Sequence, residues 1–543
     1  MRYVKRRSSL LFGLMAAMLL APAFAALVGV ADVRAQDRPV LRFGVEAADL
    51  NSLDPHFATG TQDRTVVDMI FNGLVRFKPG DSSVMEPDLA EAIPEPTMND
   101  DGTQSWTFAL RQGVMCHASP ETAAYELTSE DVVYSLQKSA DPITSGFAGD
   151  YAGMTFEAVD PYTVTITLDT PVSETLFLPK VANYAGGFVV CSQAVETLGP
   201  DAFTTQPVGT GPFAFSAYTP QTSVELVAND DYFRGAPKLG GVEIRYMADP
   251  SSRELALQAG DLDAADGLSE AQWVDRINSE GTLQADVFGV GEVAFFSINV
   301  TVAPFDNPLV REAIALAISK EDHLALYGEP VAQNVFSPVP ADLMPGGLTM
   351  EEAEAAGVLW EQDIERAKEL LAEAGFADGF EVDLITSEMA AYRSNYEVLA
   401  AELADIGITV NLQVVDHATM HEQIRDDVNP ITLYVAFRPN ADVYLNQFFH
   451  SNAIIGTETA ITNFAHYSAV DDLIEQAHAE TDAAAQEELW KQAQIQILQD
   501  FAAIPLHYQN QVYARTQNVD YGHELVSSLA LYPQIDETTT ITE

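Results

Sequence analysis

The chain has 543 residues, of which 47% are hydrophobic, and its 80 Asp and Glu against 27 Lys and Arg give a net charge of -53. This charge excludes an ordinary nucleic-acid groove and argues against an anionic membrane surface as partner. The hydrophobic content is that of a packed globule and excludes an acidic disordered chain, and the length indicates two or more domains.

Residues 1–35 have the features of a signal peptide. Four basic residues within positions 2–7 precede an apolar run over 10–20, and small-residue cleavage sites follow at 23–25 and 33–35. We expect cleavage after Ala35, with Ala25 as the alternative. An uncleaved anchor over 10–30 and export by the twin-arginine route are further alternatives. Because no cysteine lies near the end of this leader, we expect a free periplasmic protein rather than a lipoprotein.

The next part of the chain predicts strands and a helix around a polar loop. Residues 40–46 alternate as a strand, and a polar loop leads to a helix through 66–71. Residues 86–207 are expected to form an inserted subdomain. Its elements are strands at 106–110 and 162–168 and an amphipathic helix at 129–138.

The only cysteines, Cys116 and Cys191, both fall within this subdomain. An oxidising compartment permits a disulfide between them, but the sequence does not place their Cα atoms within bonding distance, so a bridge and two buried thiols both stay open.

Residues 209–266 predict strand, strand, helix, strand. The strands lie at 223–228 and 242–247. Ser251 is expected to open the helix because Glu254, three residues on, completes a capping box, and Gly260 provides the stop.

The second half predicts a strand at 293–300, then a helix with Asn307 as its cap and Pro308 in its first turn. A helix at 363–374 precedes a β-α-β-α-β run, which implies a mostly parallel sheet covered by helices. The elements of this run are a strand at 380–385, a helix at 393–406, a strand at 409–415, a helix at 418–425 and a strand at 431–437.

Ligands of such sheets meet the carboxyl ends of the strands. Those ends are Thr386-Ser387, Asp416-His417 and Phe437-Arg438. Helices at 470–479 and 483–499 then lead to a strand at 503–508.

The sequence contains no Gly-x-Ser-x-Gly elbow, no His-Glu-x-x-His and no complete Ser-x-x-Lys set, so we expect no enzyme and no cofactor. His417 and His421 share a helix face and have the spacing of two metal ligands. Without a third placed ligand, we interpret them as solvated helix residues and expect no metal.

A set of motifs spread along the chain resembles extracytoplasmic solute-binding proteins of the dipeptide, oligopeptide and nickel class of ABC importers, family 5. The motifs are FNGLVRF at 71–77, EPDLAE at 86–91, WTFALR at 106–111, TSEDVVYS at 128–135, VGTGPF at 208–213, GDLDAAD at 260–266, PFDNPLVREA at 304–313 and AKELL at 367–371.

The resemblance implies an α/β fold of two lobes, type II-like with an extra inserted subdomain, in which mixed sheets are flanked by helices. Two hinge crossings, near Ser297 and Leu506, would allow closure on a ligand. The expected division is 1–35 signal peptide, 36–85, 86–207 (inserted) and 208–296 lobe I, 297–504 lobe II and 505–543 return to lobe I.

The resemblance also implies function: a monomeric periplasmic component that captures a small peptide or peptide-like solute and delivers it to a membrane permease. Other solutes, such as a nickel chelate, an opine or an oligosaccharide, and a peptide-binding chaperone or sensor are the alternatives. In this family the loop before the first helix faces the cleft, which makes Thr59, Gly60, Thr61 and Gln62 candidate contacts.

Positive charge is scarce in the second half, where Arg393 and Arg438 lack close acidic partners in sequence. Arg438 follows Phe437 at a strand end, and a guanidinium facing a cleft suits a carboxylate, so we predict a zwitterionic or anionic solute. Dipeptide-binding relatives carry an acidic residue nearby, where this chain has Asn440, with Asp442 close behind. An ion pair between Arg438 and Asp442 is the structural alternative.

Overall fold

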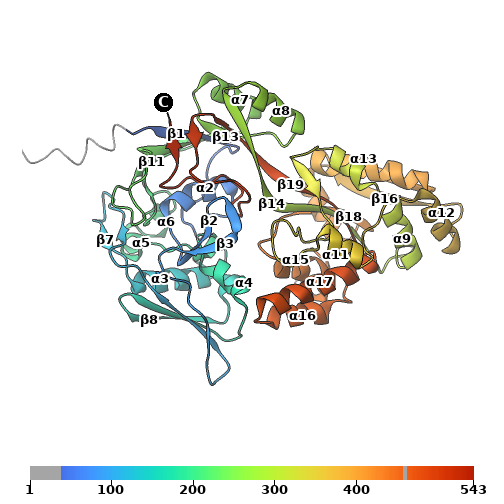
Figure 1. Ribbon diagram of the computed structural model, residues 1–543, viewed down its shortest axis with the longest axis horizontal. Coiled ribbons are helices and arrows are strands. Elements are labelled where there is room, and N and C mark those ends of the chain that lie inside the picture. The colour runs from blue at the N-terminus through green and yellow to red at the C-terminus, as the bar shows by residue number, and fades with distance from the viewer. Residues whose placement is uncertain (1–37, 457–461, 543) are drawn as a thin grey trace, which may run out of the picture.

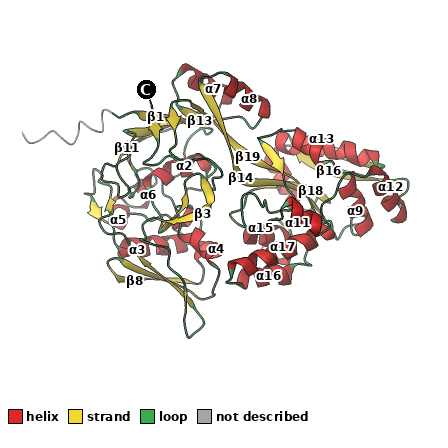
Figure 2. Cartoon of the chain, in the orientation of Figure 1, coloured by secondary structure: helices red, strands yellow, loops and turns green. Residues whose placement is uncertain are grey.

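The computed structural model describes residues 38–456 and 462–542, so the predicted signal peptide, both cleavage sites and the alternative anchor lie outside the described residues. Figure 1 shows two lobes joined by two long strands, β14 (Leu283–Ile298) and β19 (Ala503–Thr516). Helices flank the strands of both lobes (Figure 2). This is the predicted two-lobed α/β fold with mixed sheets. Within the described ranges, no helix is both long and apolar enough to cross a membrane.

One mixed sheet extends through both lobes in the order β10-β11-β12-β1-β13-β19-β14-β18, with β15 paired to β19. In lobe I, β1 lies parallel to β12 and β13, while the remaining pairs are antiparallel. The shorter members of this sheet are β1 (Val40–Val45), β10 (Phe213–Thr219), β11 (Ser223–Ala228), β12 (Gly241–Tyr246), β13 (Ala264–Asp266), β15 (Ala332–Asn334) and β18 (Ile431–Ala436).

The crossing between the lobes lies inside β14 and β19. Up to Gly289, β14 pairs with the part of β19 that contacts β13 of lobe I; from Glu292 it pairs with the start of β19 and with β18 of lobe II. The register shifts between these two residues. Both strands are longer than predicted, and they change lobes before Ser297 on β14 and after Leu506 on β19.

Lobe I combines its sheet with residues 86–207, the predicted subdomain, in which Cys116 and Cys191 form a disulfide with a Cα–Cα distance of 6.0 Å. The helices of lobe I and of the subdomain are α2 (Thr61–Ile70), α3 (Ser129–Ala140), α4 (Glu174–Phe177), α5 (Ser192–Leu198), α6 (Pro200–Phe203), α7 (Pro250–Ala259) and α8 (Ala271–Ser279). The smaller strands are β2 (Val75–Lys78), β3 (Asp81–Pro87), β4 (Thr97–Met98), β5 (Gln104–Ala109), β6 (Met115–Cys116), β7 (Tyr125–Glu126), β8 (Met154–Asp160), β9 (Thr163–Leu168), β20 (Val519–Asp520) and β21 (Thr540–Ile541).

Lobe II packs its helices around the far end of the large sheet and a parallel pair of strands, β16 (Phe380–Ser387) and β17 (Ile408–Val415). Its helices are α9 (Pro308–Ala317), α10 (Lys320–Ala325), α11 (Met350–Ala355), α12 (Ile364–Glu373), α13 (Ala390–Asp405), α14 (His417–Arg425), α15 (Ala441–Phe449), α16 (Asp471–Ala479) and α17 (Ala483–Gln499).

The predicted mostly parallel β-α-β-α-β sheet is only partly correct. β16 and β17 are parallel partners, but β18 pairs antiparallel with β14 of the large sheet. Between β16 and β18 the buried side chain of Asn429 substitutes for a ladder, since it bonds both the N–H of Ile385 (2.8 Å) and its carbonyl (2.9 Å). A side-chain amide can satisfy the backbone of a strand edge in this way.

Two helix starts differ from the prediction. The cap of α7 is Asp249, whose carboxylate accepts the N–H of Ser252, so Ser251 lies inside the helix and Pro250 takes its first position. The expected partner Glu254 instead accepts from the indole of Trp273 (2.9 Å). Helix α2 begins at Thr61, which places part of the predicted loop in the first helical turn.

Candidate ligand-binding cleft

A cavity of about 490 Å³ lies between the lobes, within the size range of small-molecule sites. Lobe I contributes the β2–β3 hairpin, the chain that follows it, the α4 region and a C-terminal loop, while lobe II contributes the segment after β18 and a loop at 343–345. The lining residues are Phe77, Ser82, Ser83, Met85, Ile93, Pro94, Glu95, Glu174, Thr175, Leu178, Pro179, Leu343, Met344, Pro345, Phe437, Pro439, Asn440, Ser527 and Leu529.

The lining is apolar with a few polar groups, as expected of a ligand pocket. Glu95 and Glu174 are its charged members, both exposed and both from lobe I. The uncharged polar groups of the lining are serine and threonine hydroxyls and the side-chain amide of Asn440. The cleft therefore offers negative charge on its lobe I side, where a cationic group of a ligand would be stabilised.

The predicted strand ends of lobe II do lie close together, because β16 and β17 are parallel and end at one edge. His417 Nδ1 and Ser387 Oγ are 3.0 Å apart. The ring of His417 contacts those of Tyr392 and His421, with centroids 5.3 and 4.5 Å away, and His421 in turn contacts Tyr434 of β18 at 5.9 Å. Tyr434 also contacts the ring of Phe448, with centroids 5.6 Å apart, and the guanidinium of Arg438 lies over that ring.

Arg438 is not itself among the residues that line the cleft, although its chain neighbours Phe437 and Pro439 are. Its Nη1 donates to the carbonyl of Phe437 (2.7 Å), its Nε donates to Gln447, and its guanidinium lies over the ring of Phe448 at 4.9 Å. Burial lowers the pKa of Arg438. Among the described residues it has no ion-pair partner, and the alternative ion pair with Asp442 is not formed.

The predicted site residues fall into separate places. Phe437 and Asn440 line the cleft, and Asn440 also caps α15 through the N–H of Val443 (3.0 Å). Asp442 lies in a neighbouring outer cavity of about 380 Å³ and accepts from His478 (3.0 Å). Arg393 is half-exposed on α13 and pairs with Glu397, four residues on, so the expectation that it lacks a partner is wrong.

The loop residues from lobe I do not join this group. Thr61 and Gln62 line a third cavity, of about 220 Å³, made entirely of lobe I residues at the ends of β1 and β13. Gly60 is the N-cap position of α2, and Thr59 before it is exposed. Their role as ligand contacts stays a prediction.

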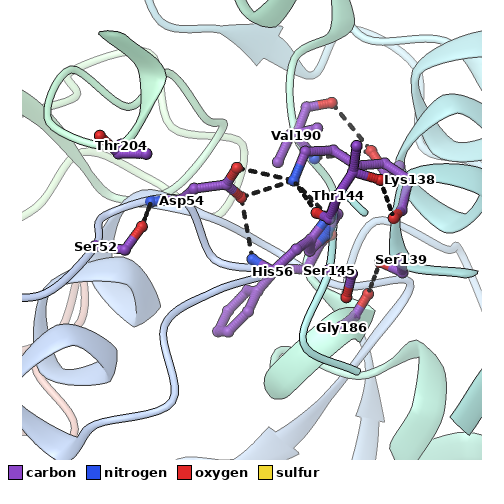
Figure 3. Close-up of polar contacts among 12 residues, drawn as sticks. Ser52, Asp54, His56, Lys138, Ser139, Thr144, Ser145, Gly186, Val190 and Thr204 are labelled. Atoms are coloured by element: carbon purple, nitrogen blue, oxygen red, sulfur yellow. Dashed lines mark hydrogen bonds and ion pairs between the residues drawn. The ribbon is translucent and has the colours of Figure 1, made fainter. Parts of the chain in front are cut away.

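A buried charge cluster holds this loop in place (Figure 3). The ammonium of Lys138, on α3, contacts both carboxylate oxygens of Asp54 at 2.8 and 2.9 Å, His56 Nδ1 at 3.2 Å and the carbonyl of Thr144 at 3.1 Å. His56 Nε2 is 2.9 Å from the carbonyl of Phe188. Burial, and after it the charge of Lys138, lowers the pKa of His56 to about 4, so the ring is neutral and donates to Phe188.

Sequence reasoning missed the lobe I wall of the cleft. Ser82 and Ser83 on β3, Glu95 in the chain that follows it and Glu174 on α4 come from three stretches, and none of the four residues belongs to a quoted motif. The sequence signal that could have pointed to them is weak: the polar tip of a short hairpin, and a Ser-Glu pair at the start of a short helix.

His417 and His421 remain a pair. Over residues 38–456 and 462–542, no group of three or more His, Cys, Asp or Glu side chains could hold a metal ion.

Both the sequence and the structure are similar to those of known proteins. Residues 84–455 match the model for bacterial extracellular solute-binding proteins, family 5. The structure is similar to that of MoaA from A. tumefaciens R10 in complex with mannopinic acid, with 39% sequence identity and a TM-score of 0.74 over 93% of this chain and 100% of the other.

It is also similar to the Helicobacter pylori periplasmic binding protein DppA in complex with the peptide STSA, at 25% identity and a TM-score of 0.71 over 94% of this chain and 100% of the other. Heme-binding protein A of Haemophilus influenzae is 27% identical over 82% of this chain and 83% of its own length. Proteins of this family are periplasmic and deliver small ligands to ABC permeases, and these relatives are binding proteins rather than enzymes. The chain belongs to the family 5 extracellular solute-binding proteins and is the substrate-binding component of an ABC importer.

Proposed function

We propose that the cleft binds a small zwitterionic solute derived from an amino acid, either a short peptide or an opine-like acid. The observation that carries this proposal is the charge distribution around the cleft. Arg438 has only neutral hydrogen-bond partners among the described residues, and Glu95 and Glu174 line the opposite, lobe I side. A carboxylate on the ligand would pair with the guanidinium in fork geometry, and an ammonium would face the two glutamates.

The relatives support the same chemistry. MoaA, which is in complex with mannopinic acid, has the higher identity of the two ligand complexes described above, and the peptide complex of DppA comes next. Both named ligands are acids or peptides. Phe437 and Asn440, which line the cleft, are the proposed neighbours of Arg438 in binding.

In our proposal the protein works as a periplasmic monomer after removal of the leader. It turns over no substrate, because capture needs only a lined cleft and a hinge, and it passes its ligand to its own cognate permease. The crossing strands β14 and β19 would bend where their register shifts, and the ligand would stabilise the closed form by contacting both lobes.

The identifying experiment is mass spectrometry of the small molecule that copurifies with the periplasmic protein. We expect a compound with both a carboxylate and an amine. Calorimetry with that compound should then give a single site, and small-angle scattering should show a smaller radius of gyration with it. A neutral sugar as the copurified ligand would overturn the ligand class, whereas an unchanged radius of gyration would overturn closure alone.

A further inference from the structure

A short segment of lobe I, residues 172–181, contacts lobe II away from the hinge. Ser173 Oγ donates to Oε1 of Gln486 on α17 (2.7 Å), and both side chains are buried. Three residues further on, Leu176 is buried in a cluster of lobe II side chains that includes Phe295 and Trp490. The lobes are therefore joined at a third place, besides β14 and β19.

This segment separates two inter-lobe cavities. Glu174, Thr175, Leu178 and Pro179 face the ligand cleft. Leu176 and Lys180 face the outer cavity of about 380 Å³, whose lobe II wall is formed by Asn440, Asp442, Val443 and His478. Because the outer cavity is bounded by both lobes, its width changes whenever the lobes rotate about the hinge.

The lobe II wall of the outer cavity holds an incompletely satisfied carboxylate. Asp442 is 6% exposed, and its Oδ2 accepts from Nδ1 of His478 at 3.0 Å. Its Oδ1 is buried and has no hydrogen-bond partner in the described part of the chain. A buried carboxylate oxygen without a donor is costly, so this atom favours any arrangement that brings it a cation.

The lobe I wall supplies a cation. The ammonium of Lys180 donates to the carbonyl of Asp150 (2.8 Å) on its own lobe and, among the described residues, forms no ion pair. Burial lowers the pKa of Lys180, while the carboxylate of Asp150 on its own lobe and, after it, that of Asp442 across the cavity act in the raising direction. Asp150 and Asp169 also line the cavity but belong to the same lobe as Lys180.

We propose that Lys180 and Asp442 form an electrostatic latch between the lobes, in which further closure moves the ammonium from the carbonyl of Asp150 to the free Oδ1 of Asp442. Only contacts that differ between two states shift their equilibrium. Asp150 and Asp169 move with Lys180 and attract it equally in the open and closed forms, whereas Asp442 approaches it only on closure. The latch therefore stabilises the closed form from outside the cleft.

The latch can be tested on the full-length protein without any ligand. Cysteines introduced at Ile143 in lobe I and Glu361 in lobe II, both exposed, would carry spin labels, because the native cysteines are joined to each other and do not react. Pulsed electron resonance at low salt reports the distribution of distances between the lobes. Lys180→Met should lower the equilibrium constant between the closed and open forms about fivefold, the lower end of a typical coupling between sites.

Matched variants separate the latch from a general effect of charge. Lys368→Met removes the same charge from α12, where Lys368 pairs with Glu365 at 3.3 Å, and should leave the distances unchanged. Asp442→Asn should shift them as Lys180→Met does, and the double variant should shift them no further. The exchange Lys180→Asp with Asp442→Lys should recover part of the closed fraction.

Two outcomes would overturn the latch: a Lys180→Met distribution equal to that of the parent, or fully additive effects of Lys180→Met and Asp442→Asn. Circular dichroism of each variant would establish that it is folded. If Asp442→Asn proved unstable because it also loses the His478 contact, the lysine variant and its control would decide alone.

Discussion

Lys138 in lobe I and Arg438 in lobe II are cations with limited exposure that differ in their partners: only Lys138 contacts a carboxylate among the described residues. The ammonium of Lys138 has a carboxylate, an imidazole nitrogen and a carbonyl around it, and its side chain is 7% exposed beside an Asp54 that is 2% exposed. Arg438 has a carbonyl, an amide oxygen and an aromatic face, and no acidic partner among the described residues.

The different partners of these two cations indicate different roles, one in the stability of the fold and one in ligand binding. A saturated buried ion pair contributes to stability because removal of either partner leaves a charge uncompensated. A partly buried cation that has only neutral partners is still available to a ligand carboxylate, and each hydrogen bond to a charged group contributes about 1.5 to 3 kcal/mol. We therefore expect Lys138 to control the folding of lobe I and Arg438 to control binding.

The largest expected effect is on Lys138. Lys138→Met should lower the free energy of unfolding by about 3 to 5 kcal/mol, because Asp54 is left as a buried unpaired charge. Urea denaturation followed by circular dichroism measures this value. Arg438→Met is the control and should change stability by no more than about 1 kcal/mol. Equal losses in the two variants would refute the distinction.

The disulfide is the second support of lobe I. It closes a loop over a sequence separation of 75, and replacing both cysteines by alanine should cost about 2 to 4 kcal/mol of stability. Unfolded parent protein under non-reducing conditions should show no titratable thiol. Two free thiols in that assay, or an unchanged urea midpoint in the alanine variant, would contradict this prediction.

The third prediction concerns binding. Arg438→Ala should weaken binding of the copurified ligand by about 1.5 to 3 kcal/mol while leaving the fold intact, because the ligand carboxylate loses its guanidinium. Calorimetry gives the affinity. Arg393→Ala removes an exposed arginine of the same lobe that pairs with Glu397, and it should bind as the parent does. Unchanged affinity in Arg438→Ala would exclude the proposed contact.

The smallest expected effect is a pH dependence of the Lys138 cluster. Burial lowers the pKa of His56 from 6.5 to about 4, so between these values the unfolded chain binds a proton that the folded protein does not. The contribution of His56 is complete above pH 6.5 and falls as the pH decreases toward 4. From pH 7 to pH 5 the loss should be about 2 kcal/mol.

Urea denaturation at both pH values would measure this loss. In His56→Gln the difference between pH 7 and pH 5 should shrink by that amount, with a remainder from His117 and His507, whose pKa values burial lowers to about 4 and about 3. An equal pH dependence in parent and variant would mean that His56 does not contribute.

Much of the architecture could be predicted from the sequence because it depends on local patterns. Hydrophobic periodicity identified both helices 471–479 and 483–499 and the strands of lobe II, and Asn307 caps α9 as expected. Arg438 was singled out because it follows a strand and lacks a nearby acid in the sequence, and its role as a ligand contact stays a prediction. The same reasoning failed for Arg393, whose partner Glu397 is one helical turn away.

Other features depended on contacts between distant segments. Local patterns could not show that Cys116 and Cys191 come within bonding distance, that β18 pairs with β14 rather than with β16, or that β14 continues through both lobes. Nor could local patterns show that Glu95 and Glu174 line the same cleft as Asn440 of lobe II.

What the sequence by itself determined, then, was the set of elements and the family motifs, since periodicity and capping are properties of neighbouring residues. Only the tertiary structure decided which charges are satisfied. Lys138 meets Asp54 across 84 residues, and Lys180 faces Asp442 from the other lobe. The strength of such a pair depends on distance and burial, which arise only when the lobes pack.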